Sequence, residues 1–165
     1  MSTYLQEVVG RLVAYDTVSQ KSNVEAMEYL ANHLDDQGFR VSLQQADVAG
    51  VPKANLVALA GPPEPDGLIL SGHVDTVPFL DQPGWTRDPL TLGLEDDRVY
   101  GRGTSDMKVF LAQCVDAAAS LDLAALKRPV VFLFTADEEV GCLGAARLMP
   151  ALSDLLGDIP QPRLA

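Results

Sequence analysis

The sequence has few of the residues that identify several common protein classes. Only two cysteines, Cys114 and Cys142, occur in 165 residues, and their spacing is not that of a metal-binding motif. A disulfide-based scaffold is therefore excluded, and we expect both thiols to be buried and reduced. No run approaches the ~20 continuous apolar residues of a membrane-spanning helix. The start, MSTYLQEVVG, lacks the basic and apolar regions of a secretory signal, which predicts a cytoplasmic protein.

Basic residues are also scarce. The chain has 12 lysines and arginines against 23 aspartates and glutamates, which gives a formal net charge of -11. A protein of this charge repels phosphate backbones and anionic lipids, so neither nucleic acid nor a membrane is expected as a partner. Apolar residues make up 47% of the sequence. This content and length are enough for one globular domain with a hydrophobic core.

Helical and extended patterns alternate along the chain. Apolar residues at helical spacing predict helices over residues 3–15, 22–37, 107–121 and 142–152. Short apolar or alternating runs predict strands over residues 39–43, 55–60, 67–72 and 129–134. Thr3 and Ser22 are the expected N-caps of the first two helices, and Asp96 and Asp97 form the expected turn of a hairpin. The alternation predicts an α/β sandwich.

Three polar clusters follow predicted strands or a tight turn. His73 and Asp75 come directly after LILSG, Asp106 ends the turn GRGTSD, and the acidic residues of TADEE follow VVFLF. In open α/β sheets, ligands bind beyond the carboxyl ends of the strands, where these clusters are expected to lie. One imidazole with several carboxylates suits a zinc-like or cobalt-like ion, and carboxylates can bridge two such ions. The clusters are therefore candidates for a metal site.

The side chains around this candidate site suggest a division of roles. Asp75 could accept the second ring N–H of His73 and fix its tautomer. Of the adjacent Glu138 and Glu139, one could bind metal while the other transfers protons. Each cluster also has a simpler interpretation, as a hydrogen-bonded loop pair, a tight turn, or a solvated turn or helix start. The residues alone leave both interpretations open.

Four longer motifs resemble one enzyme family. SGHVDTVP, GWTRDPLTL, VYGRGTSDMK and FTADEEVGCLGA, in this order and spacing, resemble the zinc-dependent deacylase and aminopeptidase family that includes acetylornithine deacetylase, succinyl-diaminopimelate desuccinylase and carboxypeptidase G. The resemblance covers nearly the whole chain, and WTRDP and DEEVGCLGA look most like the acetylornithine deacetylase members. It implies a three-layer α/β sandwich with a mixed, mostly parallel sheet flanked by helices.

The resemblance also implies a site with two metal ions, either Zn2+ or Co2+. His73 would bind one ion, Asp106 would bridge both ions, and Glu139 would bind the other. Glu138 matches the general base, and Asp75 matches the residue that orients His73. The implied reaction is attack of a metal-activated water on a small N-acyl amino acid. In the arginine-biosynthetic members this would convert N-acetylornithine to ornithine and acetate.

The chain departs from the family pattern at two points. Val109 stands where members usually have glycine directly after DMK. Members are also much longer, and they carry a further carboxylate ligand, a C-terminal histidine ligand and a separate lid and dimerisation domain. Residues 1–165 are therefore expected to be the N-terminal part of a catalytic domain whose complete parent is a homodimer. The alternatives are a noncatalytic binding module derived from the family, or a related deacylase or dipeptidase with another substrate.

Overall fold

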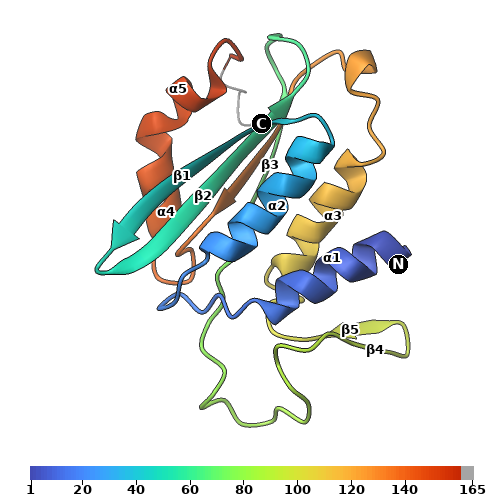
Figure 1. Cartoon of the computed structure of the whole chain (residues 1–165), viewed down its shortest axis with the longest axis vertical. Coiled ribbons are helices and arrows are strands. Elements are labelled where there is room, and N and C mark those ends of the chain that lie inside the picture. Colours follow the sequence, from blue (N-terminus) through green and yellow to red (C-terminus); the bar gives the residue numbers. More distant parts are fainter. Residues whose placement is uncertain (161–165) are drawn as a thin grey trace.

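The structure is a computed structural model that describes residues 1–160. Its elements are α1 (Thr3–Ala14), α2 (Val24–Asp36), β1 (Arg40–Val48), β2 (Val51–Ala60), β3 (Leu68–His73), β4 (Gly93–Glu95), β5 (Arg98–Tyr100), α3 (Lys108–Ala118), the 3-10 turn η1 (Leu123–Ala125), β6 (Val130–Thr135), α4 (Leu143–Leu148), the 3-10 turn η2 (Met149–Ala151) and α5 (Leu152–Leu156). Figure 1 shows α1, α2 and α3 in front of the main sheet, with α4 and α5 behind it.

The main sheet is mixed, with the strand order β1-β2-β6-β3. β3 and β6 are parallel, whereas β1 with β2 and β2 with β6 are antiparallel. Antiparallel pairing thus predominates in the described strands, where mostly parallel pairing was expected. The reason for β1 and β2 is local, because only Ala49 and Gly50 connect them and a two-residue turn joins antiparallel strands. The parallel strands β3 and β6 are connected through α3, as a parallel crossover requires.

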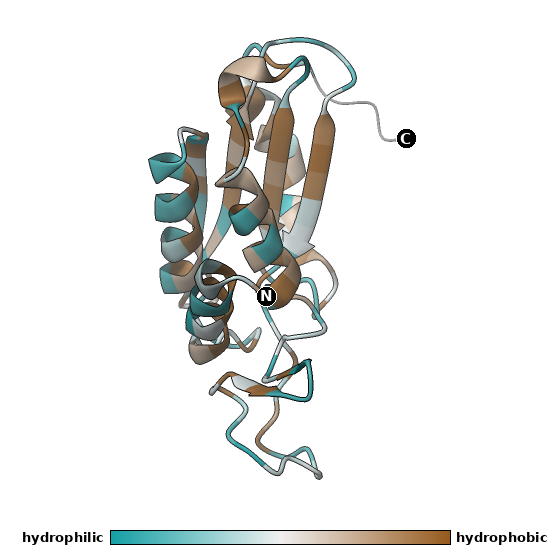
Figure 2. Cartoon of the chain, turned by 90° about the vertical axis from the view of Figure 1, so that its right-hand side faces the viewer, coloured by the Kyte–Doolittle hydropathy of each residue, from teal (hydrophilic) through white to brown (hydrophobic). Residues whose placement is uncertain are grey.

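The sheet has a separate apolar core on each face, which confirms the three-layer sandwich. Alternate residues of β6 divide between the cores, because successive side chains of a strand point to opposite faces. Phe132 and Phe134 pack in the core formed with α1, α2 and α3. Val131 and Leu133 pack in the second core, which α4 and α5 cover. In Figure 2 the strands are predominantly hydrophobic, while the helices carry hydrophilic residues on part of their circumference.

Two predicted helix caps are wrong by one residue. Ser2, not Thr3, is the N-cap of α1, and its side chain accepts a hydrogen bond from the Leu5 N–H at 3.0 Å. The N-cap of α2 is Asn23 rather than Ser22. The Asn23 side chain has a tertiary role, because it bonds both the N–H and the carbonyl of Ala54 on β2 at 2.8 Å. Local pattern does not reveal such a contact between distant segments.

The predicted hairpin is confirmed, and one cysteine prediction is wrong. β4 and β5 turn at Asp96 and Asp97, both with positive φ, as a two-residue hairpin turn requires. Cys114 is buried on α3 as expected. Cys142 is exposed, because it precedes α4 in the loop that follows β6 instead of lying on an apolar helix face.

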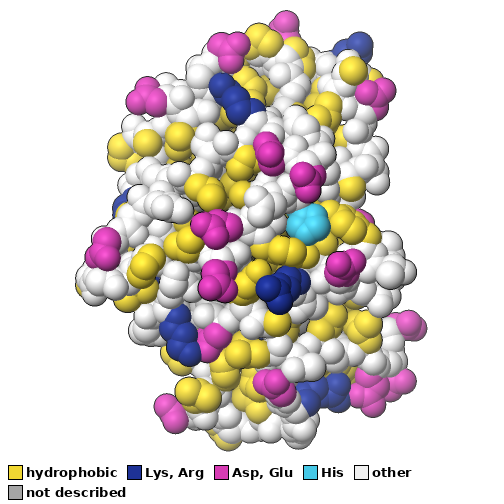
Figure 3. All heavy atoms as spheres, in the orientation of Figure 1, with side chains coloured by type: hydrophobic (Ala, Val, Ile, Leu, Met, Phe, Trp, Pro, Cys, Tyr) yellow, Lys and Arg dark blue, Asp and Glu magenta, His cyan; other side chains and the backbone are white. Residues whose placement is uncertain are grey.

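Acidic side chains are dispersed over the face shown in Figure 3 rather than gathered in one patch. Among residues 1–160, no helix combines the length and apolar character needed to cross a lipid bilayer.

Candidate metal centre

The parallel pairing of β3 and β6 brings two of the polar clusters together. β3 ends at His73 and β6 ends at Thr135, and these two residues are partners in the sheet register. The segments that carry Asp75 and Glu138 therefore leave the sheet at the same edge. This is the position at which open α/β sheets form their ligand sites.

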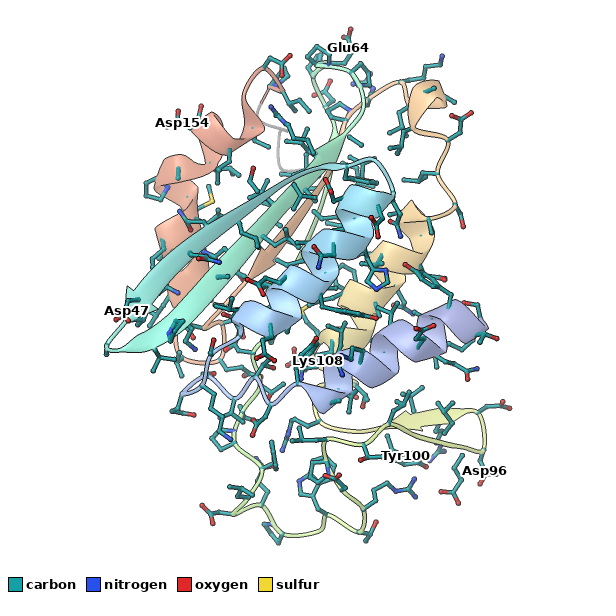
Figure 4. The ribbon with its side chains drawn as sticks, in the orientation of Figure 1. Asp47, Glu64, Asp96, Tyr100, Lys108 and Asp154 are labelled. Carbon is teal, nitrogen blue, oxygen red and sulfur yellow. The ribbon has the colours of Figure 1, made fainter. Side chains whose placement is uncertain are left out.

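The third cluster reaches this edge from the start of α3. Asp106 precedes the helix, and its side chain is 70% exposed. Lys108, in the first turn of α3, is fully buried and donates a hydrogen bond to the carbonyl of Tyr15 at 2.7 Å. Burial lowers the pKa of Lys108 to about 8. Figure 4 shows Lys108 where the start of α3 meets the end of α1, so this contact ties the segment that carries Asp106 to the helical layer.

The three predicted metal ligands converge. Ligand atoms of His73, Asp106 and Glu139 all lie within 4.8 Å of one another. His73 is 4% exposed, and its Nε2 lies 2.9 Å from Oδ1 of Asp106. A buried imidazole facing two carboxylates is a donor set suited to a zinc-like divalent ion. The residues present therefore fit the metal that the sequence predicts.

The pKa values at this cluster reflect crowded acidic groups around one imidazole. Burial by itself would lower the pKa of His73, but hydrogen bonds to Asp75 and Asp106 outweigh it and raise the pKa to about 9. Burial raises the pKa of Glu139, and the nearby negative charge of Asp106 raises it further. A divalent cation would relieve this repulsion between carboxylates, since it supplies the missing positive charge.

Asp75 is the most highly connected acidic residue of the site. Its carboxylate accepts hydrogen bonds from the backbone N–H groups of Glu138 at 3.0 Å and Glu139 at 3.2 Å, and from the Ser19 hydroxyl at 2.8 Å. Burial would raise the pKa of Asp75, but its hydrogen bonds outweigh that effect and lower the pKa. His73 Nδ1 lies 3.0 Å from the Asp75 carbonyl and 3.4 Å from its carboxylate. Asp75 thus holds both the histidine and the acidic segment.

Glu138 lies beside the three converging ligands. Its Oε2 is 3.6 Å from His73 Nε2, and its side chain is 43% exposed. A cavity of about 400 Å3 adjoins it, lined among others by His73, Asp106, Met107 and Cys142. A carboxylate at the border of the metal ligands and an open cavity is placed where a proton could be exchanged with a bound substrate.

Val109, which departs from the family pattern, is accommodated inside α3. It lies within the helix rather than at a turn, and its φ is not positive. A β-branched residue can adopt this conformation without the strain that a left-handed backbone would impose. The backbone at Val109 therefore does not need a residue without a side chain.

Two residues that support the site carry no signal in the sequence that would mark them. Ser19 binds Asp75 from the segment between α1 and α2, and Lys53 on β2 pairs with Asp137 at 2.7 Å. Lys53 lies in a strand whose sequence pattern gives no sign that its charge is buried. Only the fold brings these residues to the candidate ligands.

Comparison with known proteins identifies the class of this chain. The model of Peptidase family M20/M25/M40 matches residues 69–162, a segment that contains all five predicted site residues. The chain belongs to this family.

Two curated relatives show which enzymes this chain is similar to in sequence. The chain is 42% identical over 146 residues to the acetylornithine deacetylase of Salmonella arizonae and 40% identical over 145 residues to that of Photorhabdus laumondii. Each alignment covers 84% of this chain and 37% of the relative. The chain thus spans little more than a third of the length of these relatives.

Solved structures show the same fold. The M20 family metallo-carboxypeptidase Sso-CP2 from Sulfolobus solfataricus aligns with a TM-score of 0.76 and 24% identity, covering 94% of this chain and 36% of that one. Human carnosine dipeptidase 1 aligns with a TM-score of 0.75 and 19% identity, covering 96% of this chain and 37% of that one. These similarities confirm the α/β fold of the chain.

Proposed function

We propose that this chain carries the metal-binding part of a metal-dependent amide hydrolase. The observation that supports the proposal is the convergence of His73, Asp106 and Glu139 within 4.8 Å, next to the carboxylate of Glu138. Membership of the M20/M25/M40 family supports the same reaction class.

We assign each site residue a role in this reaction. His73, Asp106 and Glu139 bind metal, and Asp75 orients His73 while holding the backbone of the glutamate pair. Glu138 is the general base, which removes a proton from the attacking water and delivers it to the leaving amine. The bound ion would polarise the amide carbonyl and make water a better nucleophile.

We propose Zn2+ or Co2+ as the ion and two ions in the complete enzyme, with Asp106 bridging them. The mixture of imidazole and carboxylate ligands supports this choice. The described residues supply one group of three ligands. Residues 1–165 are proposed to form the N-terminal part of a catalytic domain, and the remainder of the domain would complete the ligand set.

The proposed substrate is a small N-acyl amino acid, most specifically N-acetylornithine. The two acetylornithine deacetylases that are 40% and 42% identical to this chain support that choice. By the same comparison we propose a cytoplasmic enzyme that is a homodimer when complete and that serves arginine biosynthesis. A related deacylase or dipeptidase specificity, and a noncatalytic binding role, are the alternatives that an assay must separate.

The test is hydrolysis of N-acetylornithine, N-succinyl-diaminopimelate and a dipeptide by the full-length protein, each with Zn2+ or Co2+ added. We expect release of acetate from N-acetylornithine to be fastest. Faster cleavage of another substrate would change the proposed specificity. Metal binding without hydrolysis of any of them would favour the noncatalytic role.

A further inference from the structure

Lys53 is a charged residue buried in the sheet next to the metal centre. Its side chain is 3% exposed, although lysine is almost never buried without a partner. Its Nζ donates hydrogen bonds to the carbonyls of Ser19 at 2.7 Å and Lys21 at 2.8 Å. The same atom lies 2.7 Å from Oδ1 of Asp137. The buried ammonium group therefore has two carbonyl acceptors and one ion-paired carboxylate, and the Asp137 contact lacks hydrogen-bond geometry.

Asp137 is the residue directly before the two glutamates of the site. It is buried and has a positive φ of 58°, which is uncommon for a residue with a side chain. Its carboxylate lies between Lys53 and Arg147, whose guanidinium donates a hydrogen bond to Oδ2 at 2.9 Å. Two cations therefore hold this turn of the chain from opposite oxygens of one carboxylate.

The position of Lys53 follows from the sheet register. β2 pairs with β6 as far as Leu56 and Phe134, and continuing the same register would set Lys53 opposite Asp137. β6 ends at Thr135, and beyond this point side-chain contacts replace the backbone pairing between β2 and the chain that follows β6. Asn55 Oδ1 accepts the N–H of Ala136 at 3.0 Å, and Lys53, two residues before Asn55 in β2, pairs with Asp137.

Lys53 contacts both of the chain segments that donate hydrogen bonds to the Asp75 carboxylate. On one side, Lys53 binds the backbone of Ser19, whose hydroxyl donates to the Asp75 carboxylate at 2.8 Å. On the other side, Lys53 pairs with Asp137, and the next two N–H groups, of Glu138 and Glu139, donate to the same carboxylate. One ammonium group thus ties together both segments that bind Asp75.

We propose that Lys53 is a positioning residue for the metal centre, which holds the glutamate pair against Asp75 through Asp137. This inference rests on the proposed function, because it concerns the placement of the proposed base and metal ligand. The competing interpretation is a buried ion pair that stabilises the fold and has no effect on the site. The two interpretations differ in what happens at Glu138 and Glu139 when Lys53 is changed in a protein that still folds.

The first measurement is amide hydrogen exchange in the metal-free full-length protein. Lys53→Met removes the charge and keeps a long side chain, and Lys127→Met makes the same change at an exposed position. We expect the N–H groups of Glu138 and Glu139 to exchange about tenfold faster or more in Lys53→Met, because their acceptor is no longer held. Amides of the paired strands β2 and β6 should stay protected. Unchanged exchange at both glutamates in folded Lys53→Met would overturn the proposal.

The second measurement is titration of the full-length protein with Co2+, followed by the visible absorption of the bound ion. We expect Lys53→Met to weaken binding by about 10-fold to 100-fold, the range found when residues that orient metal ligands are changed. Lys53→Arg retains the positive charge and should bind more tightly than Lys53→Met, and Lys127→Met should bind like the unmodified chain. Unmodified affinity and absorption in folded Lys53→Met would overturn the positioning role.

A further variant distinguishes loss of the Lys53 role from misfolding, and a control distinguishes it from failure to bind metal. If Lys53→Met does not fold, Asp137→Asn provides a second test, because it removes the carboxylate charge that pairs with Lys53 and Arg147 but leaves Lys53 its two carbonyl acceptors. Exchange and Co2+ binding unchanged in Asp137→Asn would overturn the role of the pair. Failure of the unmodified full-length protein to bind Co2+ would overturn the proposed metal site, and the exchange measurement would still decide whether Lys53 holds the glutamate pair.

Discussion

One carboxylate oxygen of Asp75 accepts the backbone N–H of Glu138 at 3.0 Å, and the other lies 3.2 Å from the N–H of Glu139. The residue that follows β3 thus holds the backbone of the segment that follows β6. This relationship makes the histidine end of the site and the glutamate end a single unit. A change at Asp75 should therefore affect metal binding even though Asp75 is not among the converging ligands.

Asp75→Asn should weaken Zn2+ binding by about 10-fold to 100-fold. Asparagine keeps the shape, but its NH2 group cannot accept a hydrogen bond, so one glutamate N–H loses its acceptor. Calorimetric titration with Zn2+ measures the effect. Ser19→Ala removes one donor to the carboxylate and leaves both N–H contacts, so its loss should be smaller. A larger loss in Ser19→Ala than in Asp75→Asn would contradict this ranking.

Asp106→Asn should sharply reduce Zn2+ affinity, because it replaces a charged ligand with a neutral amide at the proposed bridging position. Zinc content after dialysis and the dissociation constant provide the measurement. Asp154→Asn is the matched control, since Asp154 is exposed on α5, well away from Lys108 and the start of α3 in Figure 4. Equal stoichiometry and affinity in Asp106→Asn and the unmodified protein would rule out the ligand role.

Glu138→Gln should retain metal but lower kcat of the full-length enzyme by about 10^2 to 10^4, the usual contribution of a general base. The amide occupies the same space and cannot take a proton. The steady-state rate on N-acetylornithine, together with the metal content of the same sample, gives the measurement. Glu64→Gln, at an exposed turn labelled in Figure 4, should leave both unchanged. Near-normal turnover in Glu138→Gln would mean that the base lies elsewhere.

The two cysteines should differ in reactivity. Cys142 is exposed and should react with iodoacetamide in the folded protein, whereas Cys114 should react only after unfolding. Burial raises the pKa of Cys114 to about 11 from an unfolded value of 9.0. Its contribution to stability is present below pH 9 and declines as pH rises toward 11, because only the unfolded state releases the proton there. Peptide mass spectrometry measures the labelling, and equal rates at both cysteines would contradict the burial of Cys114.

Gly144→Ala should destabilise the fold by about 1–3 kcal/mol, the usual cost of overpacking a close contact. A Cβ at this position would lie 2.1 Å from the carbonyl oxygen of Ala136, in the segment that leads to the glutamate pair. Gly10→Ala is the control, because its Cβ in α1 would be 3.5 Å from Leu92 and alanine favours a helix interior. Thermal unfolding should show a lower midpoint for the first variant and an equal or higher midpoint for the second.

Much of the fold follows from patterns within short stretches of sequence. Asp96 and Asp97 tolerate the positive φ of a hairpin turn, and the β-branched and aromatic run from Val130 is suited to a buried strand. The helices α1, α2 and α3 follow from apolar residues at helical spacing, which is also a local pattern. The candidate ligands His73, Asp106 and Glu139 were identified because each stands next to such an element.

The arrangement of those elements depended on interactions between distant segments. The order β1-β2-β6-β3, with its two antiparallel pairings, depends on which strands pair and on which residues their side chains pack against. The sequence of a single strand does not specify its neighbours. For the same reason the sequence did not reveal that Asp75 binds two glutamate N–H groups, or that Lys53 is buried against Asp137. Local residue preferences thus determined the elements and the candidate ligands. Tertiary packing decided the sheet order and the buried charges behind the site, because both require residues far apart in the chain to meet.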